Sequence, residues 1–310
     1  MAKSLKVLFV FVMISLLATA CGLLGQNTPS PASGTPNATL TALFDLSQNL
    51  PSSTPPGIAT ATQQALPTVG PTTLVPTPTQ KIVPPTPTPT AKPPERSGIL
   101  MKAAFLSTAP TIDGSWAEWK DKTTQYGLDY VVWGRSNWSG KADLEAAFIA
   151  GWDKDYLYVA FKVYDDIYVQ NASGKNMYKG DSLELLVDSN LYGDVYSQQL
   201  SSDDYQLGIS GGNTEGLKPE AYLWFPTSKE GDKTNVKIAY QFDGTLYRAE
   251  AAIPWSVLGV TPTADMVLGF AASVNDNDNK TENLQQTMIS TDPNRVLADP
   301  TTWGWITLVK

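Results

Sequence analysis

Proline and tryptophan divide this sequence into two parts that cannot share one fold. Sixteen of the 23 prolines lie between residues 26 and 97, and all nine tryptophans lie after Ser97. Proline fixes φ and removes a backbone donor, and the proline-rich part contains one aromatic residue, Phe44. This part lacks the apolar surface that offsets the entropy of an ordered chain. We therefore expect a disordered Thr/Pro-rich linker over residues 22–97 and one folded domain over residues 98–310.

The first 21 residues have the pattern of an export signal. Lys3 and Lys6 precede an apolar run at residues 7–17, and residues 18–20 are the small residues that a signal peptidase requires. The run is shorter than the roughly 20 residues of a membrane-spanning helix. Cys21, the only cysteine, follows at once, and the arrangement resembles the bacterial lipobox. The resemblance implies a lipid anchor at Cys21 and a surface-exposed domain outside the cytoplasm; the alternative is an ordinary secretory signal with an incidental cysteine.

Composition and charge exclude several kinds of site. Because the chain has no histidine, a Ser-His-Asp triad, a Cys-His pair and a His-ligated zinc or haem site are impossible. One cysteine cannot form an intramolecular disulfide. The net charge is −8, with +2 in residues 1–25 and +1 in residues 26–97, so the rest of the chain carries −11. We therefore expect no nucleic-acid partner, whereas neutral ligands, cationic ligands and calcium suit this charge.

From Gly98 onward, apolar and polar residues alternate in short runs. Residues 155–163 alternate so that four apolar side chains share one face, namely Leu157, Val159, Phe161 and Val163. Residues 182–187 repeat the pattern, and residues 247–253 and 269–274 are expected to form further strands. No long segment has a helical period. The pattern predicts an all-β domain, an antiparallel β-sandwich of the immunoglobulin or jelly-roll kind.

Six motifs of this domain occur in an order that resembles carbohydrate-binding module family 9 and the wider DOMON-like group. They lie at residues 111–119, 150–159, 180–188, 252–255, 274–278 and 299–308. The resemblance covers residues 100–310. It implies a β-sandwich that binds a carbohydrate, in a family whose modules are often attached to glycoside hydrolases.

The resemblance also implies positions for a sugar site. The sugar-binding members hold a sugar end between two tryptophans, with Glu, Arg and Asn bonded to its hydroxyls. At these positions this chain has, in turn, Tyr178 and Ser290 for the tryptophans and Glu184, Gln206 and Gly208 for the polar residues. An aromatic face and a carboxylate are kept, but one wall of the site is missing. We expect Tyr178 and Glu184 to lie off the core, so that substituting either leaves stability nearly unchanged; the alternative is that both only pack or face solvent.

Trp133 and Trp138 offer a second platform. They flank Arg135 in a polar loop that contains glycine, and two indoles with a guanidinium could stack on a sugar. The alternative is a loop tucked over the end of the sandwich. Trp224 is also outside the motifs, whereas three tryptophans within them are expected in the core, namely Trp119, Trp152 and Trp255.

Residues 275–279, Asn-Asp-Asn-Asp-Asn, are dense in oxygen ligands. The run is not an EF-hand, because, counted from Asp276, glycine is absent from the sixth position of the loop and Thr287 occupies the twelfth. The family resemblance implies structural calcium, with Asp276 and Asp278 as candidate ligands. Asn and Asp are also ordinary turn residues.

These observations predict a surface-anchored, non-catalytic carbohydrate-binding module that serves polysaccharide recognition or degradation. Adjacent acids such as Asp165 and Asp166 point to opposite faces of a strand, so they do not form the carboxylate pair of a glycosidase. One alternative is a scaffold or adhesion domain without a sugar site. Another is a DOMON-type haem domain, for which Met177 and Met288 are the available ligands.

Overall fold

The computed structural model describes residues 96, 98–119 and 122–310. The export signal, Cys21 and the predicted linker, except Arg96, lie outside the described residues, and the boundary after residue 97 stays a prediction. In the described part of the chain, no helix is both long enough and apolar enough to cross a membrane.

The described residues form fourteen strands and three short 3₁₀ helices. The strands are β1 (Leu100–Phe105), β2 (Gln125–Gly127), β3 (Tyr130–Trp133), β4 (Leu144–Trp152), β5 (Tyr156–Asp165), β6 (Ser182–Asp188), β7 (Asp204–Ser210), β8 (Glu220–Phe225), β9 (Gly231–Asp232), β10 (Lys237–Asp243), β11 (Leu246–Pro254), β12 (Val267–Asp276), β13 (Thr287–Ser290) and β14 (Gly304–Val309). The 3₁₀ helices are η2 (Gly174–Lys179), η3 (Thr227–Lys229) and η4 (Pro300–Thr302).

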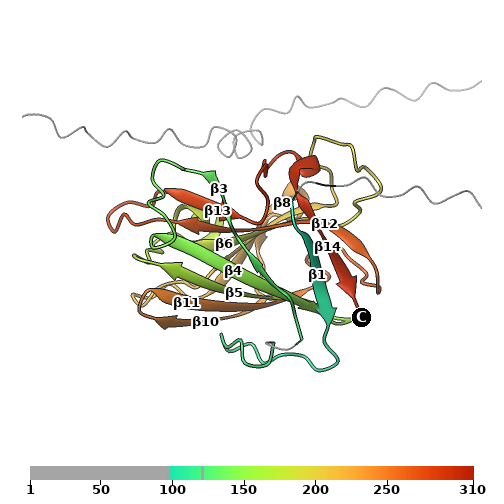
Figure 1. The fold of residues 1–310 in the computed structure, drawn as a ribbon, viewed down its shortest axis with the longest axis horizontal. Coiled ribbons are helices and arrows are strands. Elements are labelled where there is room, and N and C mark those ends of the chain that lie inside the picture. Colours follow the sequence, from blue (N-terminus) through green and yellow to red (C-terminus); the bar gives the residue numbers. More distant parts are fainter. Residues whose placement is uncertain (1–95, 97, 120–121) are drawn as a thin grey trace, which may run out of the picture. The chain divides into compact units, whose positions relative to one another are not determined.

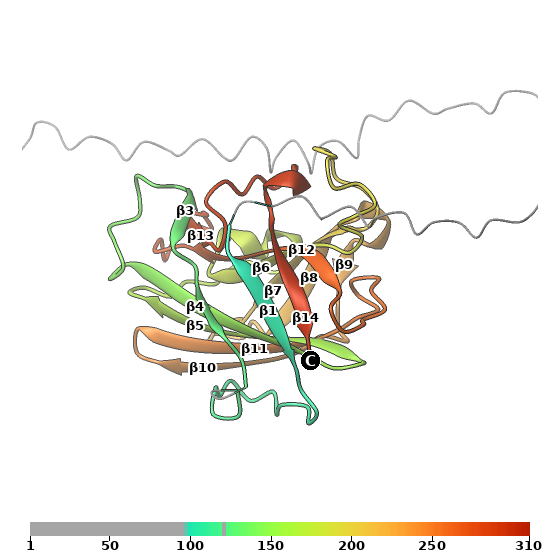
Figure 2. The same cartoon turned by 45° about the vertical axis from the view of Figure 1, so that its right-hand side comes forward.

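The strands pair into one continuous sheet that curls into two layers (Figure 1). One layer contains β10, β11, β5 and β4, and the other contains β12, β6, β7, β8 and β9. Between them, β1 and β14 lie side by side (Figure 2). The predicted all-β sandwich is confirmed. Its pairings are antiparallel except those of β1, which runs parallel to β14 and β4.

The central core lies between the two layers. The four apolar residues of β5 that were predicted to share a face are all completely buried there, namely Leu157, Val159, Phe161 and Val163. The three tryptophans that were predicted to be buried are buried, Trp152 and Trp255 in the central core and Trp119 in a smaller cluster on the outer face.

Each layer also carries a smaller apolar cluster on its outer face. On β4, β5 and β11 this cluster includes Leu106 and Trp119 from the segment after β1. On β6 and β12 it includes Leu297 and Trp303 from the segment between β13 and β14. Loops therefore cover part of both outer faces, and this decides which side chains there meet solvent.

Candidate functional site

Glu184 and Gln206 lie on neighbouring strands, on the face of the sheet turned away from the central core. Leu183 and Leu185 belong to the core, so Glu184 between them points outward, as the alternation predicts. Nε2 of Gln206 donates to Oε2 of Glu184 at 3.1 Å. The two side chains that the sequence placed in one site are therefore in contact.

Arg295 covers Glu184 from the loop after β13. Its guanidinium donates to Oε1 of Glu184, and the side chains of this ion pair are 7% and 1% exposed. Burial lowers the pKa of Arg295, against the opposing effect of Glu184 and Asp292. Glu184 is thus outside the central core but deeply buried, because a loop covers the outer face of β6. Its place off the central core agrees with the prediction, but because the side chain is buried, that place does not imply that its substitution leaves stability nearly unchanged.

Two polar atoms of this cluster have no hydrogen-bond partner among the described residues. They are Oε1 of Gln206 and Nε of Arg295, and both are buried. Buried polar atoms almost always have partners, either in the protein or in ordered water. One atom accepts and the other donates, so a hydroxyl group could satisfy either of them.

Tyr178 supplies an aromatic side chain on the same outer face of this layer. It lies in η2 and packs on the outer apolar cluster that contains Leu186 and Trp303. Its ring meets that of Trp224 edge to face, with centroids 6.3 Å apart. Burial raises the pKa of Tyr178. The residue is half-buried: it lies outside the central core, as predicted, but packs against a smaller apolar cluster on the outer face.

Gly208 and Trp224 are matched in shape. A Cβ atom at position 208 would lie 2.3 Å from Cη2 of Trp224 and 2.8 Å from Sδ of Met177. Nε1 of Trp224 donates to the carbonyl of Lys175 at 2.9 Å, which holds the indole in place. The glycine that replaces the family's Asn therefore makes room for an indole, which the sequence left unassigned.

The position of the second family tryptophan carries no aromatic side chain. Ser290 is fully buried, and its hydroxyl is bonded to that of Ser273 at 3.0 Å. The second aromatic side chain is therefore absent, as the sequence indicated, and a small hydrogen-bonded side chain stands in its position.

Trp133 and Trp138 do not join this site. Trp138 packs against the central core, and its Nε1 donates to the carbonyl of Leu144 at 3.0 Å. The guanidinium carbon of Arg135 lies 4.6 Å from the centre of the Trp138 ring. Trp133 ends β3, which pairs with β13. For Trp138 these contacts agree with the second of the two interpretations, in which the loop packs over the end of the sandwich.

A separate group of acids brings together residues of three segments. Ligand oxygens of Asp165, Asp181 and Asp276 lie within 4.8 Å of one another, and all three residues are buried. A second group, of Asp143, Asp166 and Asp278, has the same spacing. Adjacent Asp165 and Asp166 thus point to different groups, as strand alternation predicts. Asp276 and Asp278 were predicted as ligands; the other four come from distant segments that gave no local signal.

The ionisation of these acids is strongly perturbed. Burial, followed by the charges of Asp278 and Asp165, raises the pKa of Asp276 to about 8. Burial raises the pKa of Asp165 to about 6. Oδ1 of Asp276 and Oδ2 of Asp165 are buried without a hydrogen-bond partner in the described chain. Unpartnered carboxylate oxygens from converging acids are the donor set that calcium takes, so these residues fit the ion that the family resemblance implied.

Comparison with known proteins identifies the family of this domain. Residues 112–310 match the family described as carbohydrate family 9 binding domain-like. Endo-1,4-beta-xylanase A of Thermotoga maritima is 29% identical over 213 residues, which are 69% of this chain and 18% of that enzyme. Exoglucanase XynX of Acetivibrio thermocellus is 30% identical over 200 residues, which are 62% of this chain and 16% of that protein. The chain therefore spans less than a fifth of either relative.

Two solved structures share the fold. Both are of a carbohydrate binding module family 9 from Caldicellulosiruptor kristjanssonii, one in complex with cellotriose and one with glucose. The cellotriose complex is 23% identical, with a TM-score of 0.51, and the match covers 67% of this chain and 94% of that one. The glucose complex is 22% identical, with a TM-score of 0.50, and the match covers 68% and 94%. Because the family match covers more than half of this chain, the chain belongs to the carbohydrate family 9 binding domain-like family.

Proposed function

We propose that the domain is a non-catalytic module that binds a β-1,4-linked oligosaccharide. The observation that carries the proposal is its membership of a carbohydrate-binding family over residues 112–310. The relatives named as endo-1,4-beta-xylanase and exoglucanase support this ligand class, as does the module solved with cellotriose.

The site that we propose is the cluster of Tyr178, Glu184, Gln206 and Arg295. Sugar recognition needs an apolar plane for the C–H face of the ring and paired polar groups for its hydroxyls. Tyr178 offers the plane, and the unpartnered atoms of Gln206 and Arg295 offer an acceptor and a donor. Because Arg295 covers Glu184, binding requires the guanidinium to share that carboxylate or move from it. We expect affinity in about the millimolar to high-micromolar range, roughly 4–6 kcal/mol.

The absence of catalysis is part of the proposal. A glycosidase holds two carboxyls about 5–9 Å apart across a cleft that admits the sugar. Glu184 is buried in an ion pair, and in each of the three groups of Asp residues the carboxylate oxygens lie within 4.8 Å of one another rather than facing each other across a cleft. This arrangement supports binding rather than hydrolysis.

Calcium is the proposed structural ion. Asp165, Asp181 and Asp276 would hold it, with Asp143, Asp166 and Asp278 beside them. A divalent cation would neutralise charges that otherwise repel each other in a buried space. Its role would be to fix the ends of β5 and β12 and the start of β6, which is the strand that carries Glu184.

A lipid anchor is proposed to hold the protein at the membrane. Cys21 lies outside the described residues, and the lipobox-like sequence is its support. Replacing Cys21 with Ser should release the protein from membranes into the soluble fraction, because it removes the residue that would carry the acyl chains of the anchor. A variant that stays membrane-bound and is processed like the parent would refute the anchor.

Titration of the full chain, purified in mild detergent, with cellotriose tests the binding function. Binding should be lost on Tyr178→Ala and on Glu184→Gln and retained in Tyr164→Ala, an exposed tyrosine on the opposite layer. Melting curves of each variant separate lost binding from lost folding. Binding that survives both substitutions moves the site elsewhere, with the Trp133–Trp138 loop examined first.

If no glycan binds the folded chain, the scaffold or adhesion alternative is the better one. The haem alternative has a separate readout, because haem ligated by Met177 or Met288 would absorb near the Soret band. Both methionines are almost completely buried in packed structure.

A further inference from the structure

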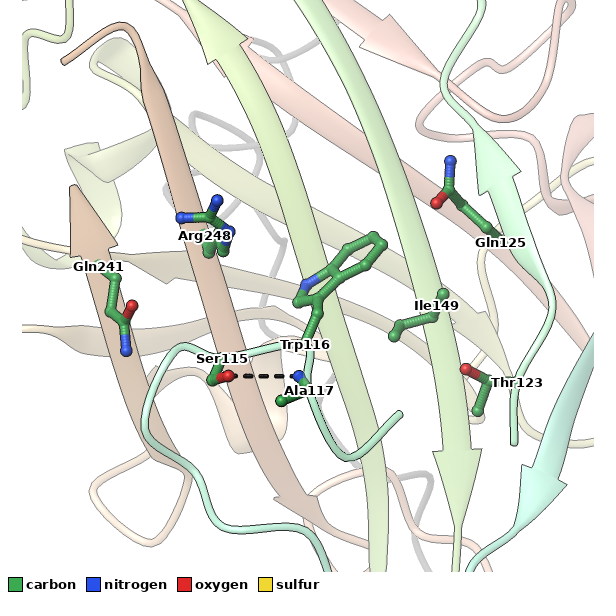
Figure 3. Close-up of a pocket in the computed structure, with 8 residues that line it drawn as sticks. All are labelled: Ser115, Trp116, Ala117, Thr123, Gln125, Ile149, Gln241 and Arg248. Carbon is green, nitrogen blue, oxygen red and sulfur yellow. Dashed lines mark hydrogen bonds between the residues drawn. The ribbon is translucent and has the colours of Figure 1, made fainter. Parts of the chain in front are cut away.

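The layer opposite the Glu184 cluster carries a cavity of about 510 Å³ on its outer face. Part of the lining comes from residues 115–117, Thr123 and Gln125, in the segment that crosses this face. The rest comes from Ile149 of β4, Gln241 of β10 and Arg248 of β11 (Figure 3). The residues of the Glu184 cluster take no part in it, so the cavity is a separate feature.

Trp116 lies across the middle of this cavity. Figure 3 shows its indole over the sheet, with Arg248 on one side and Ile149 on the other. Between β11 and β4, the strand β5 presents a small residue, Ala160, whose register partners are Glu250 and Ile149. Nε1 of Trp116 has no hydrogen-bond partner among the described residues. The cavity therefore contains an aromatic plane and an unused donor.

Arg248 brings a positive charge that nothing in the described chain neutralises. The structure gives its guanidinium no ion pair within 4.0 Å and no hydrogen bond to a described residue. Its register partner on β5 is another cation, Lys162, whose ammonium lies 5.3 Å from the ring centre of Tyr164. Two adjacent cations without an acid stand out in a domain that carries −11.

The nearest acid on the same face of β11 is already engaged. Glu250 accepts from the backbone N–H groups of Asp113 and Gly114 at 2.9 and 2.8 Å. It also accepts from Nε1 of Trp119 at 2.6 Å. Three hydrogen bonds hold the carboxylate of Glu250 in place, so it does not pair with Arg248. The guanidinium of Arg248 is therefore available to a group from outside the domain.

We propose that this cavity is a second binding site, which takes a sugar that carries a carboxylate. The indole of Trp116 would lie against the C–H face of the ring, and the planar guanidinium of Arg248 matches a carboxylate bidentately. The amide of Gln125 suits hydroxyl groups, as does Oε1 of Gln241, whose Nε2 donates to the carbonyl of Asp113 at 2.8 Å. A cavity of this volume has the size of a small-ligand site. The inference does not depend on the function proposed for the Glu184 cluster.

Calorimetric titration of the full chain, in detergent, with trigalacturonate tests the proposal. The parent should bind, and more weakly as salt rises, because part of the attraction is between exposed charges. Arg248→Gln should weaken binding by at least about tenfold, and Arg248→Lys by less, since lysine keeps the charge but not the fork. Lys218→Gln, an exposed lysine outside the cavity, is the matched control and should bind as the parent does.

Three results would overturn the proposal. They are no binding of trigalacturonate by the parent, equal binding by parent and Arg248→Gln, and displacement of the sugar by equimolar inorganic phosphate, which would indicate a general anion site. Melting curves of the variants exclude misfolding as the cause of a loss. Cellotriose is titrated in parallel: binding of trigalacturonate alone supports this site and refutes the Glu184 site, and binding of cellotriose alone does the reverse.

Discussion

Arg295 donates a hydrogen bond to Oε1 of Glu184 from 111 residues further along the chain. The ion pair is buried on both sides, so each charge depends on the other for its compensation. Gln206 occupies the position of the family's arginine, and it bonds Oε2 of the same carboxylate. A loop arginine thus brings to Glu184 the positive charge that strand β7 lacks at position 206.

Removing one member of this pair should destabilise the domain more than removing both. Arg295→Gln leaves a buried carboxylate without its cation and should cost about 3–5 kcal/mol of unfolding free energy. The double variant Glu184→Gln with Arg295→Gln should recover much of that loss. Denaturant unfolding of the four proteins of the cycle measures the coupling, with Arg135→Gln as an exposed-arginine control. Additive losses would show that the two side chains do not interact.

A methyl group at position 208 should be destabilising on its own. Gly208→Ala would place a Cβ 2.3 Å from Cη2 of Trp224, and such overpacking typically costs about 1–3 kcal/mol. The added methyl needs the space that the indole fills, so combining it with Trp224→Leu should cost less than the sum of the two single changes. Thermal melting of both single variants and of the double variant checks this. Strict additivity would mean that the indole moves aside freely.

Strand alternation predicted the faces of residues correctly but not their exposure. A period of two decides whether a side chain enters the core, so Leu157 and Phe161 were placed correctly. Whether an outward residue meets water depends on loops without periodicity. The segment that carries Arg295 gave no signal that it covers Glu184, so the burial of Glu184 could not be predicted.

The acidic cluster shows the same limit. Asp276 was predicted as a ligand because oxygen-bearing residues crowd its own segment. Asp165 ends β5 and Asp181 precedes β6, and only the pairing of strands brings them to Asp276. The parallel pairing of β1 with β14 was missed for the same reason, since it joins segments that are about 200 residues apart. A local pattern indicates which ligand atoms one segment can supply, whereas the residues that join them from other segments are determined by how the strands pair.

Chelation of calcium should lower the melting temperature. A ligand that binds only the folded chain stabilises it by mass action, by about 2.7 kcal/mol at 100 times its dissociation constant. Asp276→Asn should abolish the difference between melting curves with calcium and with chelator. Asp232→Asn, which changes an exposed carboxylate outside all three acidic groups, should keep it. Identical curves for the parent with and without chelator would remove the ion.

Asp188 and Asp204 face each other across β6 and β7, and both are 1% exposed. Burial raises the pKa of Asp204 to about 7, and the charges of Asp188, Asp194 and Asp203 add to the effect. Burial likewise raises the pKa of Asp188 to about 6, against the opposing charge of Arg96, which lies 3.7 Å away. The ordinary value in the unfolded chain is 3.8.

Stability should therefore fall as pH rises through this window. Below about pH 4 both states hold the proton of Asp204, but between about pH 4 and 7 only the folded state keeps it, so raising the pH favours unfolding. Asp204→Asn removes this proton and can still accept from the backbone N–H of Ser201. Its unfolding free energy relative to the parent should increase from pH 5 to pH 8, by about 1–2 kcal/mol. Denaturant unfolding at both pH values measures the difference, with Asp232→Asn as the exposed control. A difference that does not change with pH would show that Asp204 is already ionised throughout the window.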